Sequence, residues 1–149
     1  MEAVAVGGAV MLAAQVKVPL PWTPVPVTLQ TLPVLAAAFI VGRERAMAGI
    51  LLYLALGLAG APLFAVAFGP TLGYLLAFAL VPYVATFFRR PALGLALATL
   101  VVYALGTAWL CLWLHVGLGA GLVMAVLPFV PADAVKAGLA YAAARRTQP

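Results

Sequence analysis

Two charged side chains, Asp133 and Lys136, lie in an otherwise apolar stretch near the end of the chain. Asp133 is the only aspartate in the sequence, and its spacing from Lys136 places both side chains on one face of a helix. The carboxylate can accept hydrogen bonds and the ammonium can donate them, so the pair can satisfy a ligand with groups of both kinds. We therefore predict that Asp133 and Lys136 form a ligand site.

The distance from this pair to the arginines that follow indicates that the pair is deep in a membrane. Arg145 lies twelve residues after Asp133, which is about 18 Å along a helix axis. If Arg145 marks a membrane surface, Asp133 lies near the middle of the bilayer, where a charge at a helix centre costs roughly 2.5–3.5 kcal/mol. A ligand site would explain why a charged residue is kept at this depth. A kinked helix with an internal salt bridge is the alternative interpretation.

Two prolines, Pro128 and Pro131, precede the aspartate and support a cavity beside it. Neither can donate a backbone hydrogen bond, so the carbonyls of Met124 and Leu127 lose their helical partners. Within a membrane, such carbonyls are tolerated only where protein or a water-filled cavity satisfies them.

The composition predicts an all-α integral membrane protein. Of the 149 residues, 67% are hydrophobic and 7% are charged, and the mean hydropathy is +1.21, well above what a soluble domain needs. No polar stretch is long enough to fold outside the bilayer, so we expect residues 1–149 to form a single domain. The net charge of +5 comes from isolated basic clusters between apolar segments, which does not match a nucleic-acid-binding surface.

The inventory of reactive side chains excludes several classes of membrane enzyme. The sequence contains no serine, so a serine nucleophile is excluded. The carboxylates are Glu2, Glu44 and Asp133, and we expect only one of them to be buried, which excludes a paired-aspartate protease. The single His115 and single Cys111 exclude a histidine or cysteine metal site and an internal disulfide. We expect no enzymatic activity, no metal and no resident cofactor.

Six apolar segments are each near the length that a helix needs to cross the hydrocarbon. They cover residues 2–18, 28–42, 46–63, 71–88, 92–116 and 120–144. Arginines follow the second, fourth and sixth segments, at 43 and 45, 89 and 90, and 145 and 146. The positive-inside rule then predicts a multi-pass bundle of six transmembrane helices with both termini in the cytoplasm.

The first and second segments are joined by a stretch that contains four prolines, at positions 19, 21, 24 and 26. This density excludes a helix and favours extended backbone, so we predict a structured external loop. Polar side chains follow at once, namely Thr28, Gln30 and Thr31. We interpret the segment as a lid over a pocket to which Gln30 contributes an amide; a rigid turn with a helix cap from Thr28 is the alternative.

Aromatic residues supply candidate walls for the pocket. Tyr74 can stack on a ligand or hydrogen-bond to it, and a tyrosine at the membrane interface is the alternative. Apolar contacts are expected from Trp22, Phe64 and Phe129, and from Trp109 in the fifth segment. The other aromatic residues at the end of that segment, and His115, are typical of an interfacial belt.

A stripe of small residues in the first segment predicts close approach of another helix. Ala5, Ala9 and Ala13 recur at every fourth position, which places them on one helix face. Contact with a partner protein and ordinary internal packing both remain possible for this stripe.

Several of these motifs together resemble the BioY family, the biotin-binding S components of energy-coupling-factor (ECF) vitamin transporters. The resemblance is carried by 15–21 (QVKVPLP), 24–32 (PVPVTLQTL), 61–65 (APLFA), 69–75 (GPTLGYL) and 127–133 (LPFVPAD) with Lys136. The order and spacing match along nearly the whole chain. The sequence departs from the family after Phe64 and Ala65, where relatives have a longer glycine-rich insertion, and at Leu72, where they have glycine.

The resemblance implies a transported ligand and partner proteins. It implies uptake of biotin from outside a prokaryotic cell membrane, with a T-type coupling subunit and two cytoplasmic ATPases. Asp133 can then accept from the ureido N–H groups and Lys136 can meet the carboxylate or the carbonyl, with polar contacts from Gln30, Thr28, Thr31 and Tyr74. Which end of biotin meets Asp133 or Lys136 stays open at this point. A scaffold for another vitamin, such as thiamin or riboflavin, and a ligand-free structural subunit are the alternatives.

Overall fold

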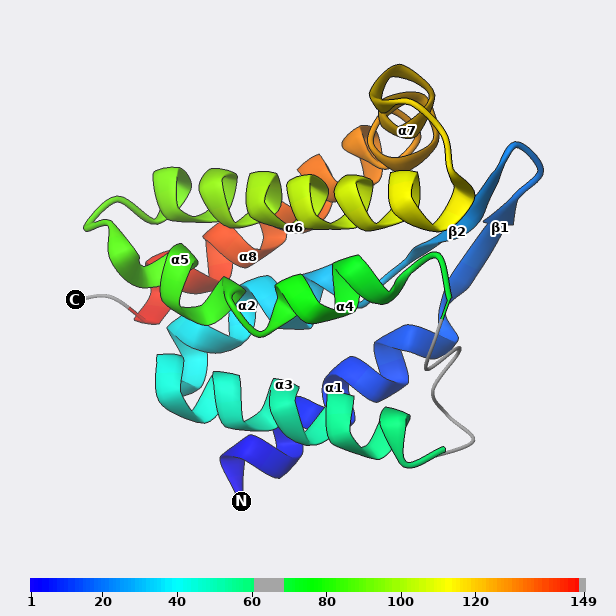
Figure 1. Ribbon diagram of the computed structural model, residues 1–149. Coiled ribbons are helices and arrows are strands. Elements are labelled where there is room, and N and C mark those ends of the chain that lie inside the picture. The colour runs from blue at the N-terminus through cyan, green and yellow to red at the C-terminus, as the bar shows by residue number, and fades with distance from the viewer. Residues whose placement is uncertain (61–68, 148–149) are drawn as a thin grey trace.

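The computed structural model describes residues 1–60 and 69–147, which form eight helices and one two-stranded hairpin (Figure 1). The helices are α1 (Glu2–Gln15), α2 (Thr31–Val41), α3 (Arg43–Leu58), α4 (Leu72–Phe78), α5 (Val81–Phe87), α6 (Pro91–Leu114), α7 (Leu118–Ala125) and α8 (Val130–Thr147). The strands are β1 (Lys17–Leu20) and β2 (Thr23–Thr28). The chain is mostly helical, as predicted from composition.

Two of the apolar segments predicted as single helices are broken. Segment 71–88 contains α4 and α5, and Pro82 near the start of α5 has no N–H to continue the α4 ladder. Segment 120–144 contains α7 and α8, which meet at an angle of 57° at the turn that carries Pro128. Within the described ranges, α6 alone is long and apolar enough to cross a membrane by itself, and the bent pair of α7 and α8 passes the same test together.

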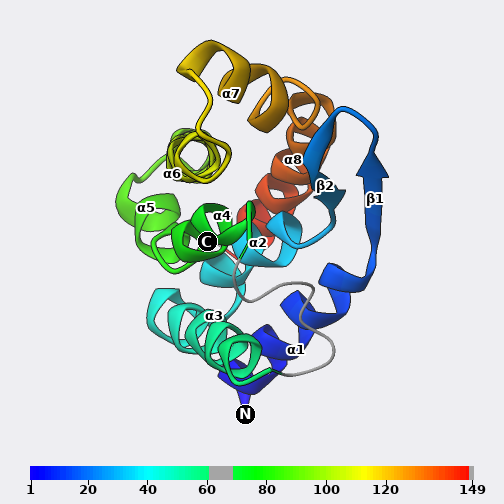
Figure 2. The same cartoon turned by 45° about the vertical axis from the view of Figure 1, so that its right-hand side comes forward.

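Helix α2 lies at the centre of the bundle, in contact with α1, α3, α5 and α8 (Figures 1 and 2). Helices α4 and α5 pack on α6, and α1 packs on α3. The contact between α1 and α3 is close because Gly49 has no side chain: a Cβ there would overlap the carbonyl oxygen of Ala3. Many large apolar side chains on the outside of these helices are exposed, among them Leu12, Ile40 and Leu100.

The arginine-bearing turns lie at one end of the bundle. Figure 1 shows the α2–α3 turn, the α5–α6 turn and the C-terminus at one end, and the hairpin at the other. Arg45 forms an ion pair with Glu2, and the guanidinium of Arg43 lies 5.2 Å from the ring centroid of Tyr83. The helix ends that carry basic residues therefore share one surface.

The proline-rich segment is extended, as predicted, and its two halves pair as an antiparallel hairpin, which the sequence analysis did not foresee. Lys17 pairs with Thr28 and Val18 with Val27. The register shifts between Val18 and Leu20, at the position of Pro19, which suits a residue that cannot donate to the ladder. The hairpin is attached to the bundle by the Thr23 hydroxyl, which donates to the carbonyl of Met124 at 2.9 Å.

Candidate functional site

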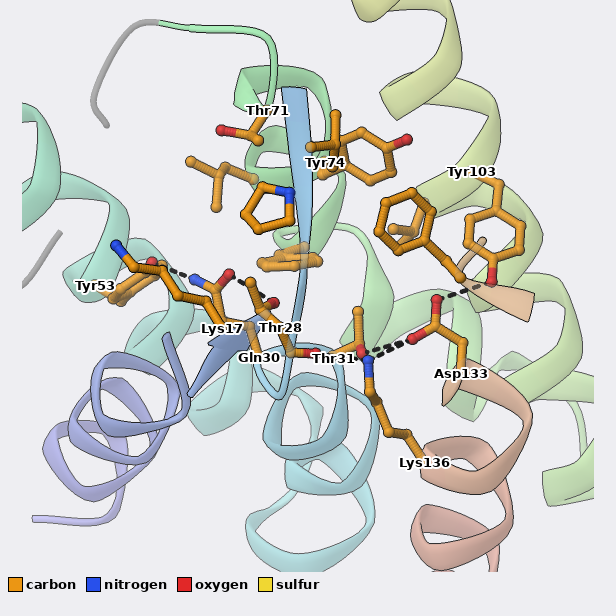
Figure 3. A pocket seen from close by; sticks show the side chains of 16 residues that line it. Lys17, Thr28, Gln30, Thr31, Tyr53, Thr71, Tyr74, Tyr103, Asp133 and Lys136 are labelled. Atoms are coloured by element: carbon orange, nitrogen blue, oxygen red, sulfur yellow. Dashed lines mark hydrogen bonds and ion pairs between the residues drawn. The ribbon is translucent and has the colours of Figure 1, made fainter. Parts of the chain in front are cut away.

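A cavity with about 80 Å³ of open space lies between the hairpin and helices α2, α3, α4, α6 and α8 (Figure 3). This open space is smaller than the roughly 300–1,000 Å³ of small-molecule sites, so lining side chains must move to admit a ligand. Its polar and charged lining residues are Lys17, Thr28, Gln30, Thr31, Tyr53, Thr71, Tyr74, Tyr103, Asp133 and Lys136. Its apolar lining residues are Val25, Pro26, Leu75, Phe78, Val102 and Phe129.

Asp133 joins three elements at one end of this cavity. One carboxylate oxygen accepts from the Thr31 hydroxyl at 3.1 Å and from the Lys136 ammonium at 2.6 Å. The other accepts from the Tyr103 hydroxyl at 2.8 Å. Asp133 is 6% exposed and lies in the first turn of α8. The sequence analysis placed Asp133 at the centre of a membrane helix. The break between α7 and α8 instead places it at a helix N-terminus, where the helix dipole favours a carboxylate.

Lys136 connects this end of the cavity to the hairpin. Its ammonium donates to the Thr28 carbonyl at 2.6 Å as well as to Asp133, and the residue is 6% exposed. An ammonium has three N–H donors, so one of them is left for a further acceptor. The ion pair is therefore satisfied by the protein alone, and it keeps one donor available beside the cavity.

Gln30 is the centre of a second polar group, on the side of the cavity formed by α3. Its amide nitrogen donates to the Tyr53 hydroxyl, and its amide oxygen accepts from the Thr28 hydroxyl at 3.0 Å. Thr28 therefore does not cap α2, which was the alternative role considered for it; Gln30 itself occupies the N-cap position, without a side-chain cap bond. Both polar groups meet at the end of β2, since Thr28 contributes its hydroxyl to one and its carbonyl to the other.

Aromatic rings form the wall of the cavity on its α6 and α7 side. Tyr74 and Phe129 have ring centroids 6.4 Å apart, and the Tyr74 hydroxyl donates to the Ala125 carbonyl at 2.7 Å. The Tyr74 ring lies directly over Gly106, where a Cβ would overlap it. The bend between α7 and α8 leaves the Ala125 carbonyl without a helical N–H partner. The Tyr74 hydroxyl donates to this carbonyl in its place.

Most of the predicted ligand-binding residues line this one cavity. They are Thr28, Gln30, Thr31, Tyr74, Phe129, Asp133 and Lys136. Trp22 and Trp109 are not among the lining residues: Trp22 is in the hairpin turn and 60% exposed. The Trp109 indole packs against Gly73 and donates to the Gly69 carbonyl at 2.8 Å. Phe64, with the loop shortened relative to the family, lies outside the described residues.

The sequence analysis missed several lining residues. Tyr53, Thr71 and Tyr103 were given no site role. Lys17 was part of the motif at 15–21 and was likewise given no site role. The signal available for Tyr53 and Tyr103 was a phenol inside an apolar helix, since a buried hydroxyl usually has a hydrogen-bond partner.

The small-residue stripe of α1 lies outside this site. Ala5 and Ala9 are exposed, whereas Ala13 is buried at 8% exposure. The two exposed alanines line an apolar groove between α1 and α2. This arrangement leaves the outer part of the stripe uncovered by the described residues.

Comparisons with known proteins give one consistent result. The family model described as "BioY family" matches residues 1–149. A protein of Pyrococcus horikoshii named "Probable biotin transporter BioY" is 37% identical over 134 residues, covering 84% of this chain and 82% of that protein. "Biotin transporter BioY2" of Lactococcus lactis is 34% identical over 145 residues, covering 87% and 80%.

A solved structure shares the fold. The crystal structure of "the S-component for biotin from an ECF-type ABC transporter" superposes with a TM-score of 0.87 at 24% identity. The match covers 97% of this chain and 87% of that chain. At this identity the likeness shows the fold, which is that of a membrane transporter component.

Proposed function

This chain belongs to the BioY family, and from that premise we propose that it is the biotin-binding membrane subunit, the S component, of an ECF transporter. Its relatives are named biotin transporters, and the protein of the same fold is titled a biotin S component. It is a transport protein rather than an enzyme, and any ATP hydrolysis would take place in separate partners.

The observation that carries this proposal is the grouping of the Asp133 and Gln30 hydrogen-bond groups around one cavity with apolar walls. Biotin has a ureido ring with two N–H donors and a carbonyl, an apolar thiophane ring and a valerate carboxylate. Carboxylate and amide oxygens can accept from the ureido group, and the third N–H of Lys136 can donate to its carbonyl or to the carboxylate. The aromatic wall can cover the thiophane ring.

The ligand-free site already satisfies its buried charges, so biotin must exchange hydrogen bonds rather than supply missing ones. The hydroxyls of Thr31 and Tyr103, which both donate to Asp133, can rotate away when a ureido N–H takes their place. Such an exchange keeps Asp133 paired throughout, which avoids an uncompensated buried charge. We infer that the site binds and releases ligand without large movement of α8.

The topology follows from the same proposal. We infer six membrane crossings, made by α1, α2, α3, α4 with α5, α6, and α7 with α8, in one domain over residues 1–149. The arginine-bearing turns then face the cytoplasm together with both termini. The pocket and the hairpin face the outside, where biotin is captured.

Partner proteins are needed because binding alone does not move a solute against its gradient. We infer a T-type coupling subunit in the membrane and a pair of cytoplasmic ATPases. The uncovered face of α1 at Ala5 and Ala9, continued by Ala13, is the surface that we assign to the coupling subunit, because small residues permit close helix approach in a membrane.

Equilibrium binding of labelled biotin to the purified protein in nonionic detergent tests the proposal, with Lys136→Ala as the control variant. We expect saturable binding at one site, which the variant loses. Thiamin and riboflavin serve as competitors, and displacement by either of them instead of biotin would indicate another vitamin. A folded protein that binds none of the three would favour the structural-subunit alternative, in which Asp133 and Lys136 only pair with each other.

A further inference from the structure

Lys17, the first residue of β1, lines the pocket away from Asp133 and Tyr103, beside Tyr53 and Gln30 (Figure 3). The hairpin register explains this position. Lys17 pairs directly with Thr28, and directly paired residues on neighbouring strands project their side chains to the same face. The Thr28 hydroxyl bonds to Gln30 within the pocket, so the same register turns Lys17 toward the pocket.

The charges of the pocket are unevenly distributed. Its charged lining residues are Lys17, Asp133 and Lys136, and the last two neutralise each other in an ion pair of 2.6 Å. Within residues 1–60 and 69–147, the Lys17 ammonium has no hydrogen bond or ion pair. The lining therefore has one net positive charge, which is located at the hairpin and attracts an anionic ligand.

Lys136 is the poorer partner for a ligand anion. Two of its three N–H donors are held at 2.6 Å by Asp133 and the Thr28 carbonyl. A carboxylate at the third N–H would lie close to the Asp133 carboxylate, and like charges at short range repel. An exposed lysine on a flexible four-carbon stem can instead meet an incoming anion at little cost in lost interactions.

We propose that Lys17 binds the carboxylate of the transported ligand and so orients it, with its anionic end at the hairpin. This inference rests on the proposed function and adds to it the residue that recognises the charge of the substrate. It makes the hairpin a part of the binding site as well as its cover, and it predicts discrimination between acids and their uncharged analogues.

Binding of biotin and of its uncharged carboxamide, biotinamide, to the wild type, Lys17→Met and Lys17→Arg tests the proposal. We expect the wild type to bind biotin about three- to thirtyfold more tightly than biotinamide, the range for a partly exposed charge-assisted contact. Lys17→Met should abolish this preference by weakening biotin binding alone, and Lys17→Arg should keep it. Added salt should weaken only the binding of biotin, and only to proteins with a cation at position 17.

The outcomes separate this proposal from the one on which it rests. If the wild type binds biotin and biotinamide equally well, carboxylate recognition by Lys17 is wrong and biotin binding stands. If Lys17→Met weakens the binding of both ligands by the same factor, Lys17 supports the hairpin and does not bind the carboxylate. If the wild type binds neither ligand although its thermal unfolding is cooperative, both proposals fail.

Discussion

The two lysines of the pocket differ in what surrounds them. Lys136 is 6% exposed and bonded to Asp133 and to the Thr28 carbonyl, whereas Lys17 is exposed and has no ion pair among the described residues. The first ammonium is part of the architecture, since it ties α8 to the hairpin. The second is free to meet a ligand. On the proposal made above, one charge in the pocket holds the fold and the other recognises the substrate, according to the partners that each already has.

The largest effect should come from Lys136→Met, which leaves the Asp133 carboxylate buried without its counter-ion. We expect a loss of about 3–5 kcal/mol in the free energy of unfolding, together with loss of biotin binding. The matched variant Lys17→Met should change stability by less than about 0.5 kcal/mol, as surface substitutions usually do. Thermal unfolding of both variants in detergent measures this, and equal destabilisation would remove the distinction between the two lysines.

The double variant Asp133→Leu/Lys136→Met sharpens the same comparison. Replacing both partners by apolar groups removes the unpaired charge, so at least half of the stability lost in the single variant should return. Biotin binding should remain absent, because the acceptor and the donor are both gone. Recovery of stability together with binding would contradict a ligand role for the pair.

A smaller effect is expected from Tyr103→Phe, which removes the hydrogen bond to the second oxygen of Asp133. Hydrogen bonds to charged groups contribute about 1.5–3 kcal/mol, so the unfolding free energy should fall by that amount. Tyr83→Phe is the matched control, because Tyr83 is exposed and its ring contact with Arg43 persists in phenylalanine. A cost no greater than that of the control would show that Asp133 does not depend on Tyr103.

Thr23→Val tests how firmly the hairpin is attached at its far end. The substitution keeps the shape of the side chain and removes two hydrogen bonds of the hydroxyl, which donates to the Met124 carbonyl and accepts from the Val25 N–H. Each bond should contribute about 0.5–1.5 kcal/mol. Amide hydrogen exchange should increase in β1 and β2 more than in α2. Thr86→Val, which removes a local bond within α5 to Pro82, should leave exchange in the hairpin unchanged.

The smallest effect on the isolated protein is expected from Ala9→Leu. Ala9 is exposed on α1, so stability and biotin affinity should change by less than about 0.5 kcal/mol. Uptake of biotin by cells should nevertheless fall, because a larger side chain holds the coupling subunit away. Ala96→Leu, on the exposed side of α6, is the control for general crowding in the membrane, and equal loss of uptake in both variants would argue against an interface at α1.

Local chemistry explains which parts of the site could be predicted from the sequence. Several site residues are polar groups in apolar or proline-rich surroundings, namely Asp133, Lys136, Gln30 and the threonines beside Gln30. This contrast can be recognised from the sequence before the structure is known. Trp22 and Trp109 were chosen because large aromatic side chains suit an apolar wall. In the structure, Trp22 lies in the hairpin turn and Trp109 packs on Gly73. No local pattern in the sequence distinguishes these positions from positions in the pocket.

The amino-acid sequence by itself determined the mostly helical membrane fold, the extended proline-rich segment and the close spacing of Asp133 and Lys136. Each of these depends on composition, on proline stereochemistry or on short spacing, which act within a few residues. Only the tertiary structure decided that Tyr103 of α6 bonds to Asp133, that Tyr53 of α3 bonds to Gln30, and that the hairpin register brings Lys17 to the pocket. Those contacts join segments far apart in the chain, and their partners are fixed by helix packing and strand register, which no local pattern of residues specifies.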